Sequence, residues 1–124
     1  MKGENMLKIE GAIPYKYGSN ERRRITESYT LANNYRVKVT TWHDKTRKAY
    51  LTAVSECEIE PREGGYTIER HTVYADFNRV VMSEPAARYS WLNMERVHNI
   101  AADAVADLVA ELIAKGAARE ITAA

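Results

Sequence analysis

The sequence predicts an α+β domain in which an antiparallel β-meander of four to five strands has one long C-terminal helix packed on one face. The sheet is predicted by apolar and polar side chains that alternate through residues 25–32 and 35–42, with an Asn–Asn pair between them. The helix is predicted by apolar residues that recur at helical spacing across residues 90–116. Because no repeat or linker divides the chain, we expect a single domain over residues 1–124.

The first two predicted strands form a hairpin. In residues 25–32, Ile25, Tyr29 and Leu31 share one parity and threonine and serine occupy the other. Asn33 and Asn34 then predict a tight two-residue turn, because asparagine tolerates a positive φ better than other non-glycine residues. Residues 35–42 continue as the most regular strand of the chain.

The next two strands are less sharply defined. Residues 49–59 predict a strand, but the polar loop 43–48 leaves its register open, so that the inward set is either Leu51 and Ala53 or Tyr50, Thr52 and Val54. A Pro- and Gly-containing turn at 61–65 leads to a fourth strand at 66–74. Its apolar residues change parity near 70–72, which predicts a bulge there.

The ends of the chain complete this expected organisation. Ser83 before Pro85 is typical of a helix start, and Gly116 suits a left-handed cap that ends the main helix. We therefore expect a less regular N-terminal segment at 1–24, the meander at 25–80, a short helical turn at 84–89, the helix at 90–116 and a tail at 117–124.

The predicted helix has more apolar circumference than one small sheet covers. A second flank consists of small or apolar residues at helical spacing, namely Ala102, Ala106, Val109, Ala110 and Ile113. Either the N-terminal segment, with Met6, Ile9 and Ile13 among its apolar residues, covers this flank, or a second copy of the chain does. The flank is thus the candidate interface of a homodimer.

Composition excludes several protein classes. Cys57 is the only cysteine, so no internal disulfide forms and a reducing cytoplasm is the expected compartment. No segment has the apolar run of a secretion signal or a membrane span, so we expect no membrane partner.

Motifs of catalysis are missing. No phosphate-binding glycine loop or serine-hydrolase elbow is present, and His43, His71 and His98 lack the spacing of metal ligands. Cys57 lies on an alternating strand and is interpreted as a core residue. We expect no catalytic residues, no metal and no cofactor, although an enzyme or ligand-binding domain with a sheet–helix pocket near His71 or His98 stays an alternative.

Charge is segregated along a chain whose formal net charge is only +1. Residues 16–48 hold nine basic and three acidic side chains, whereas residues 56–79 and 95–124 are net acidic. The basic residues either pair within the fold or form a surface for an anionic partner. Arginine and lysine near exposed aromatic side chains are typical of proteins that bind single-stranded nucleic acid, and the aromatic residues near these basic side chains in the sequence are Tyr15, Tyr17, Trp42 and Tyr50. The candidate binding residues are Arg22, Arg23, Arg24, Arg36, Lys38, Trp42, Lys45, Arg47, Lys48 and Tyr50.

In its size and its lack of catalytic motifs, the chain resembles the accessory proteins of phages and mobile elements, including the inhibitors of bacterial defence complexes called anti-CRISPR proteins. This resemblance assigns no role to any residue. We expect a non-enzymatic interaction protein that binds a protein or nucleoprotein complex. A nucleic-acid-binding module that uses the basic hairpin is the alternative, although the acidic helix argues against insertion into a DNA groove.

Overall fold

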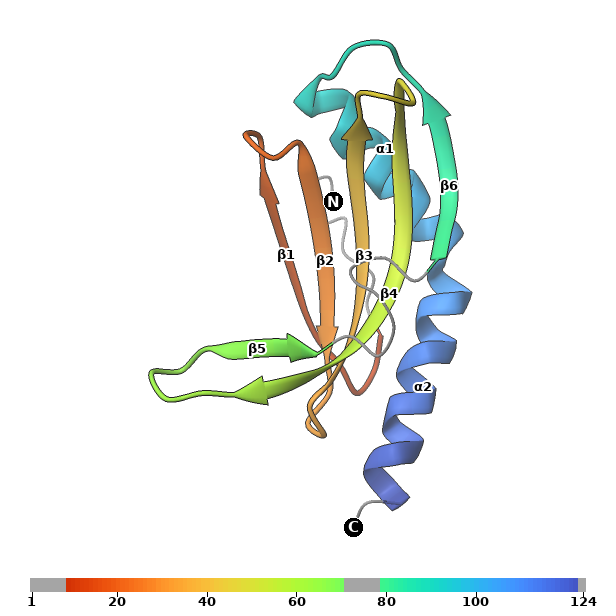
Figure 1. Ribbon diagram of the computed structural model, residues 1–124. Helices are drawn as coiled ribbons and strands as arrows, with labels where there is room; N and C mark the ends of the chain where they lie inside the picture. Colours follow the sequence, from red (N-terminus) through yellow and green to blue (C-terminus); the bar gives the residue numbers. More distant parts are fainter. Residues whose placement is uncertain (1–8, 71–78, 123–124) are drawn as a thin grey trace.

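A twisted antiparallel sheet with two helices on one face forms the fold (Figure 1), and the computed structural model describes residues 9–70 and 79–122. The strands follow the order β1-β2-β3-β4-β5, and β6 also pairs with β4. In chain order the elements are β1 (Ile13–Ser19), β2 (Arg24–Thr30), β3 (Tyr35–Asp44), β4 (Ala49–Pro61), β5 (Thr67–Arg70), β6 (Arg79–Pro85), α1 (Trp91–Ala104) and α2 (Ala106–Thr122). The predicted α+β class is confirmed, with five to six strands and two helices.

The long strand β4 joins two parts of the sheet. Its first residues pair with β6, and its last residues, from Glu58 to Pro61, pair with β5. β4 bends between these two pairings, so that the β4–β5 hairpin projects away from the main sheet (Figure 1). Of the fourth strand predicted at 66–74, the structure shows β5 at Thr67–Arg70. The rest of that strand and most of the bulge predicted at 70–72 lie outside the described residues.

The turns fix the register that the sequence left open. Thr41 pairs with Thr52 and Val39 with Val54, so Tyr50, Thr52 and Val54 face the helices and Leu51 and Ala53 face the other way. The predicted two-residue turn at Asn33 and Asn34 is wrong, because Leu31 N bonds to Tyr35 O and three residues lie between this pair. Of the two asparagines, only Asn34 adopts a positive φ, of 66°.

Segments at both ends of the meander differ from the prediction. β1 occupies part of the expected irregular segment 1–24. The expected helical turn at 84–89 is wrong because β6 runs to Pro85 and Ala86 N then bonds to Lys48 O, continuing the pairing instead. The helix cap is Ser90, whose hydroxyl accepts a hydrogen bond from Asn93 N.

The single helix predicted at 90–116 is two helices. The break lies at Val105, whose φ of −103° and ψ of 10° leave the helical region. The expected tail at 117–124 is also wrong, because α2 continues to Thr122. Gly116 is inside α2, where it permits close packing: a Cβ there would lie 2.2 Å from Cδ2 of Tyr35.

Two apolar clusters lie between the sheet and the helices. The first, under α1, contains Ile25, Tyr50, Met94 and Val97. The second, mostly under α2, contains Tyr29, Leu31, Tyr35, Val37, Val39, Val54, Val105, Val109, Leu112 and Ile113. Ile9 and Ala12 pack against the second cluster, so part of the N-terminal segment does cover the helix side. No helix in residues 9–70 and 79–122 is long and apolar enough to cross a membrane.

A buried chain of hydrogen bonds links α1 to the sheet. Glu27 is 1% exposed and His98 is 0% exposed, and Glu27 Oε1 lies 2.8 Å from His98 Nε2. The hydroxyl of Tyr29 donates to Glu27, and Thr41 Oγ1 lies 2.7 Å from both His98 Nδ1 and Thr52 Oγ1. With the ring proton on Nε2, His98 donates to Glu27 and accepts from Thr41, so both ring nitrogens have partners.

Removal of His98 will destabilise the fold, because it leaves a buried carboxylate and a buried hydroxyl without their partner. We expect His98→Ala to lower the free energy of unfolding by about 3–5 kcal/mol, measured by urea unfolding. Ile100→Ala, at an exposed position of the same helix, will change it by about 0.5 kcal/mol or less. The double variant Glu27→Leu/His98→Leu will lower the free energy of unfolding by less than the sum of the decreases caused by Glu27→Leu and His98→Leu alone. Equal losses for His98→Ala and Ile100→Ala would contradict this role.

Candidate functional site

The sheet face opposite the helices, which we call the outer face, has short hydroxyl side chains in its middle. Thr26 and Ser28 of β2 and Thr40 of β3 project there, and Thr26 Oγ1 lies 3.0 Å from Thr40 Oγ1. Tyr17 stands on the neighbouring strand β1, in register with Thr26. Short side chains between long ones make this part of the sheet a concavity.

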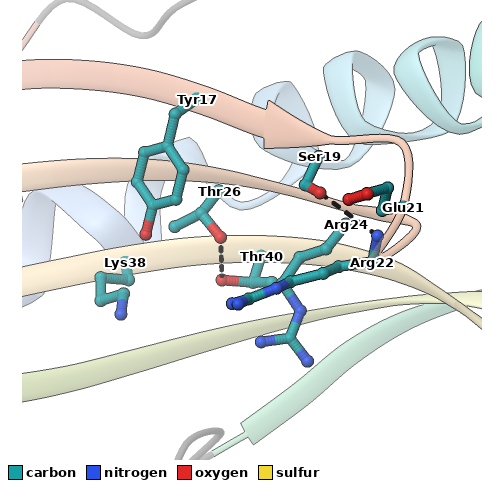
Figure 2. Close-up of a pocket in the computed structure, with 8 residues that line it drawn as sticks. All are labelled: Tyr17, Ser19, Glu21, Arg22, Arg24, Thr26, Lys38 and Thr40. Atoms are coloured by element: carbon teal, nitrogen blue, oxygen red, sulfur yellow. Dashed lines mark hydrogen bonds between the residues drawn. The ribbon is translucent and has the colours of Figure 1, made fainter.

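A pocket of about 430 Å³ occupies this concavity (Figure 2). Its lining consists of Tyr17, Ser19, Glu21, Arg22, Arg24, Thr26, Lys38 and Thr40. Figure 2 shows Tyr17 and Lys38 toward one side and Arg22 and Arg24 toward the other, with the two threonines between them. Arg22, Arg24, Lys38 and Glu21 therefore face the same space, and although Lys38 is also paired with Glu69, the two arginines give the lining an excess of positive charge that favours an anionic ligand.

The pocket lies beside a basic end of the molecule. In an antiparallel meander, alternate turns lie at the same end of the sheet, and this places the β1–β2 turn near the β3–β4 turn (Figure 1). A hydrogen bond from His43 N to Arg23 O joins the two. The resulting basic end comprises Arg22, Arg23, Lys45, Arg47 and Lys48. Within the described part of the chain, none of these five side chains forms an ion pair.

Two of these basic residues occupy backbone conformations that favour glycine. Arg23 and Lys48 both have a φ of 51°, each at the last position of its turn. A left-handed conformation costs an L-residue with a Cβ about 1–2 kcal/mol. Glycine or asparagine would relieve this cost. The Arg23 guanidinium stacks over the Tyr89 ring, 4.8 Å from its centroid, which favours arginine there, whereas the exposed Lys48 stands where folding alone favours another residue.

Other predicted binding residues have partners inside the fold. Glu69 lies 2.8 Å from both Arg36 Nη1 and Lys38 Nζ, so this part of the basic segment is paired across the sheet. Arg24 and Trp42 each also interact with a further group of the chain. Tyr50 is buried under α1, where its hydroxyl accepts from Ser90 N, and it is therefore removed from the candidate surface.

The predicted dimer flank is largely used within one chain. Ala102 is buried in α1, and Val109 and Ile113 are buried in the cluster between α2 and the sheet. Only Ala106, which is half-buried, and Ala110, which is exposed, stay accessible. A homodimer through this flank would therefore have little apolar surface to bury.

The candidate nucleophile and histidines occupy structural positions. Cys57 is buried, and desolvation raises the pKa of its thiol to about 11, so it is a poor nucleophile at neutral pH. His98 belongs to the buried hydrogen-bond chain, and His43 Nε2 lies 2.9 Å from Ala86 O. His71 lies outside the described residues. No group of three metal-ligating side chains occurs in residues 9–70 and 79–122.

A second polar cluster, which the sequence did not indicate, lies between β3, β4 and α2. Tyr35 donates a short hydrogen bond to Glu56, Lys115 Nζ lies 3.3 Å from Glu56, and the Arg119 guanidinium stacks over the Tyr35 ring. Burial, and then the bond to Glu56, raises the pKa of Tyr35. Its adjoining cavity of about 100 Å³ is too small for most ligands, so we interpret the cluster as an anchor for α2.

The sequence missed much of the pocket lining. Tyr17 is one of the aromatic residues that the sequence places near the basic side chains, but Ser19, Glu21, Thr26 and Thr40 are not candidates, because residues 1–24 are expected to be irregular and threonine carries no binding signature. The available signal was parity: Thr26, Lys38 and Thr40 all lie on the strand face opposite the core.

Comparisons of the chain with known protein families, with curated proteins and with solved structures find no match.

Acid will weaken the cross-sheet pairing at Glu69. Burial alone raises the pKa of this carboxyl, but the hydrogen bonds from Lys38 and Arg36 outweigh it and hold the pKa below its ordinary value of 4.5. A lowered folded-state pKa contributes stability above pH 4.5 that is lost as the pH falls through the folded value. We expect Glu69→Gln to be less stable at neutral pH and to lose less stability on acidification, measured by urea unfolding.

The control is Glu63→Gln in the exposed β4–β5 turn, which will keep the acid dependence of the wild type. The free energies of unfolding of Glu69→Gln and of the wild type are compared as the pH falls from neutral to below 4.5. If both fall by the same amount, the pairing at Glu69 does not contribute to the stability of the fold.

Proposed function

We propose that this protein is a non-enzymatic binding protein whose basic end holds the phosphate groups of nucleic acid. One observation carries the proposal: two basic turns that are separate in the sequence lie together at one end of the sheet, beside a pocket with Arg22, Arg24 and Lys38 in its lining. Phosphate contacts from clustered lysine and arginine supply most of the affinity of sequence-independent binding.

The charge arrangement supports an external role for part of the basic segment. Arg36 and Lys38 are neutralised by Glu69, whereas the side chains of Lys45, Arg47 and Lys48 are exposed at a hairpin tip. A projecting tip reaches a phosphate backbone without a matching groove in the protein. Internal pairing thus accounts for Arg36 and Lys38, and the proposal assigns the exposed hairpin tip to an external partner.

The partner class follows from the same surface. Nucleic acid within a nucleoprotein complex presents phosphates as free nucleic acid does, so the proposal includes a small inhibitor that occupies such a complex, as in phages and mobile elements. The size of the chain and its charged, aromatic-bearing surface support this role. A reduced, buried Cys57 suits the proposed cytoplasmic location.

Neutralising the hairpin tip will weaken nucleic-acid binding for all sequences alike. We expect Lys45→Gln/Arg47→Gln/Lys48→Gln to make the dependence of log affinity on log salt shallower by about 2–3, measured by fluorescence anisotropy with labelled oligonucleotides. A matched control lowers the net charge equally elsewhere, by Ala104→Glu/Ala110→Glu/Ala114→Glu on exposed helix positions. Equal loss for both triple variants, or no salt-dependent binding by the wild type, would refute the proposal.

Stability and binding will change in opposite directions at the end of the β3–β4 turn. Lys48→Gly relieves a left-handed backbone, so the free energy of unfolding will rise by about 1 kcal/mol, while the salt slope of binding falls by about 1. Lys45→Gly removes the same charge from the same turn, at a residue without positive φ, and will not stabilise the fold. Unchanged binding by Lys48→Gly would show that this charge serves no partner.

A further inference from the structure

Two tyrosines on the edge strand β1 are exposed although neither is needed for the core. Tyr15 is 63% exposed and Tyr17 is 44% exposed, and both project onto the outer face because they pair with Ser28 and Thr26. Their ring centroids lie 5.5 Å apart with an interplanar angle of 32°. Adjacent exposed rings on one strand form a platform that flat, apolar groups can stack against.

The tyrosine platform leads directly into the basic pocket. Tyr17 belongs to the pocket lining, and Arg22 lies on the opposite side of the pocket, with Thr26 and Thr40 between them (Figure 2). The pocket volume of about 430 Å³ lies within the range of small-ligand sites and is sufficient for a nucleotide. The floor hydroxyls bond to one another, and each retains capacity for another hydrogen bond.

We infer that the outer face beside β1 binds single-stranded nucleic acid, with bases stacked on Tyr15 and Tyr17 and backbone phosphates held by Arg22 and the basic end. This inference rests on the proposed function and specifies the form of nucleic acid. Aromatic side chains on a sheet face with cations beside them are the combination that binds unpaired bases.

Single strands fit this surface better than the alternatives. In a duplex the base faces are stacked on one another and are not available to Tyr15 or Tyr17. A second copy of the chain could pair with the edge of β1 through its backbone, but the pocket beside Tyr17 is cationic and two copies would repel each other there. An anionic strand complements both the rings and the charge.

The test compares one labelled oligothymidylate, single-stranded and annealed to its complement, by fluorescence anisotropy with the full chain. We expect tighter binding of the single strand. Tyr15→Ala/Tyr17→Ala will weaken that binding by about fivefold or more, the loss of at least one stacked base, and leave duplex binding and the salt slope unchanged. Tyr15→Phe/Tyr17→Phe, which keeps the rings, will bind as the wild type does. Tyr66→Ala is the matched control, because Tyr66 is 65% exposed near the tip of the β4–β5 hairpin.

The other possible results distinguish failure of the single-strand inference from failure of the proposed function. If the protein binds single strand and duplex equally and with salt dependence, and the tyrosine substitutions do not change the affinity, the inference is wrong and the proposed function stands. Absence of salt-dependent binding to either probe overturns both. If the alanine variant instead changes the molecular mass in light scattering while binding is unaffected, the platform is an interface between copies of this chain, and the inference fails.

Discussion

The buried pair of Glu27 and His98 constrains the whole arrangement of sheet and helices. Two ionisable groups can lie in the interior only if their polar atoms find partners, and Tyr29 and Thr41 supply these from the same sheet face. A shift of α1 along the sheet would break these bonds, whereas apolar contacts alone tolerate sliding. The polar chain thus holds α1 in place over β2 and β3, on the face opposite the pocket.

With both helices on one face, the part of the other face that β1, β2 and the middle of β3 form has short hydroxyl side chains, the edge tyrosines and Lys38. Thr26 and Thr40 are too short to fill the space between Tyr17 and the cations around them, and this difference in length makes the pocket. The meander adds charge to the same region, because its antiparallel connections place both basic turns at one end. Cavity and charge therefore have one topological origin.

Features that are unfavourable for folding gather on this surface. Arg23 and Lys48 have left-handed backbones, and Tyr15 and Tyr17 expose large rings on an edge strand. Elsewhere the chain is locally consistent: Ser90 caps α1, Asn34 takes the positive φ of its turn, and Gly116 lies where a Cβ would clash with Tyr35. Local conflict at binding surfaces, with consistency elsewhere, is the pattern expected of a fold that has a function to serve.

The sequence alone determined the α+β class, the central strands and the start of the helix near Ser90, because alternation, helical periodicity and capping act through near neighbours. It could not settle the β3–β4 register, the break at Val105 or the burial of Tyr50, since these depend on how the helices pack on a twisted sheet. It indicated Arg22, Lys38 and Tyr17 but not Thr26 or Thr40. A pocket between strands exists only after pairing brings distant residues together, and that pairing is decided by the tertiary structure.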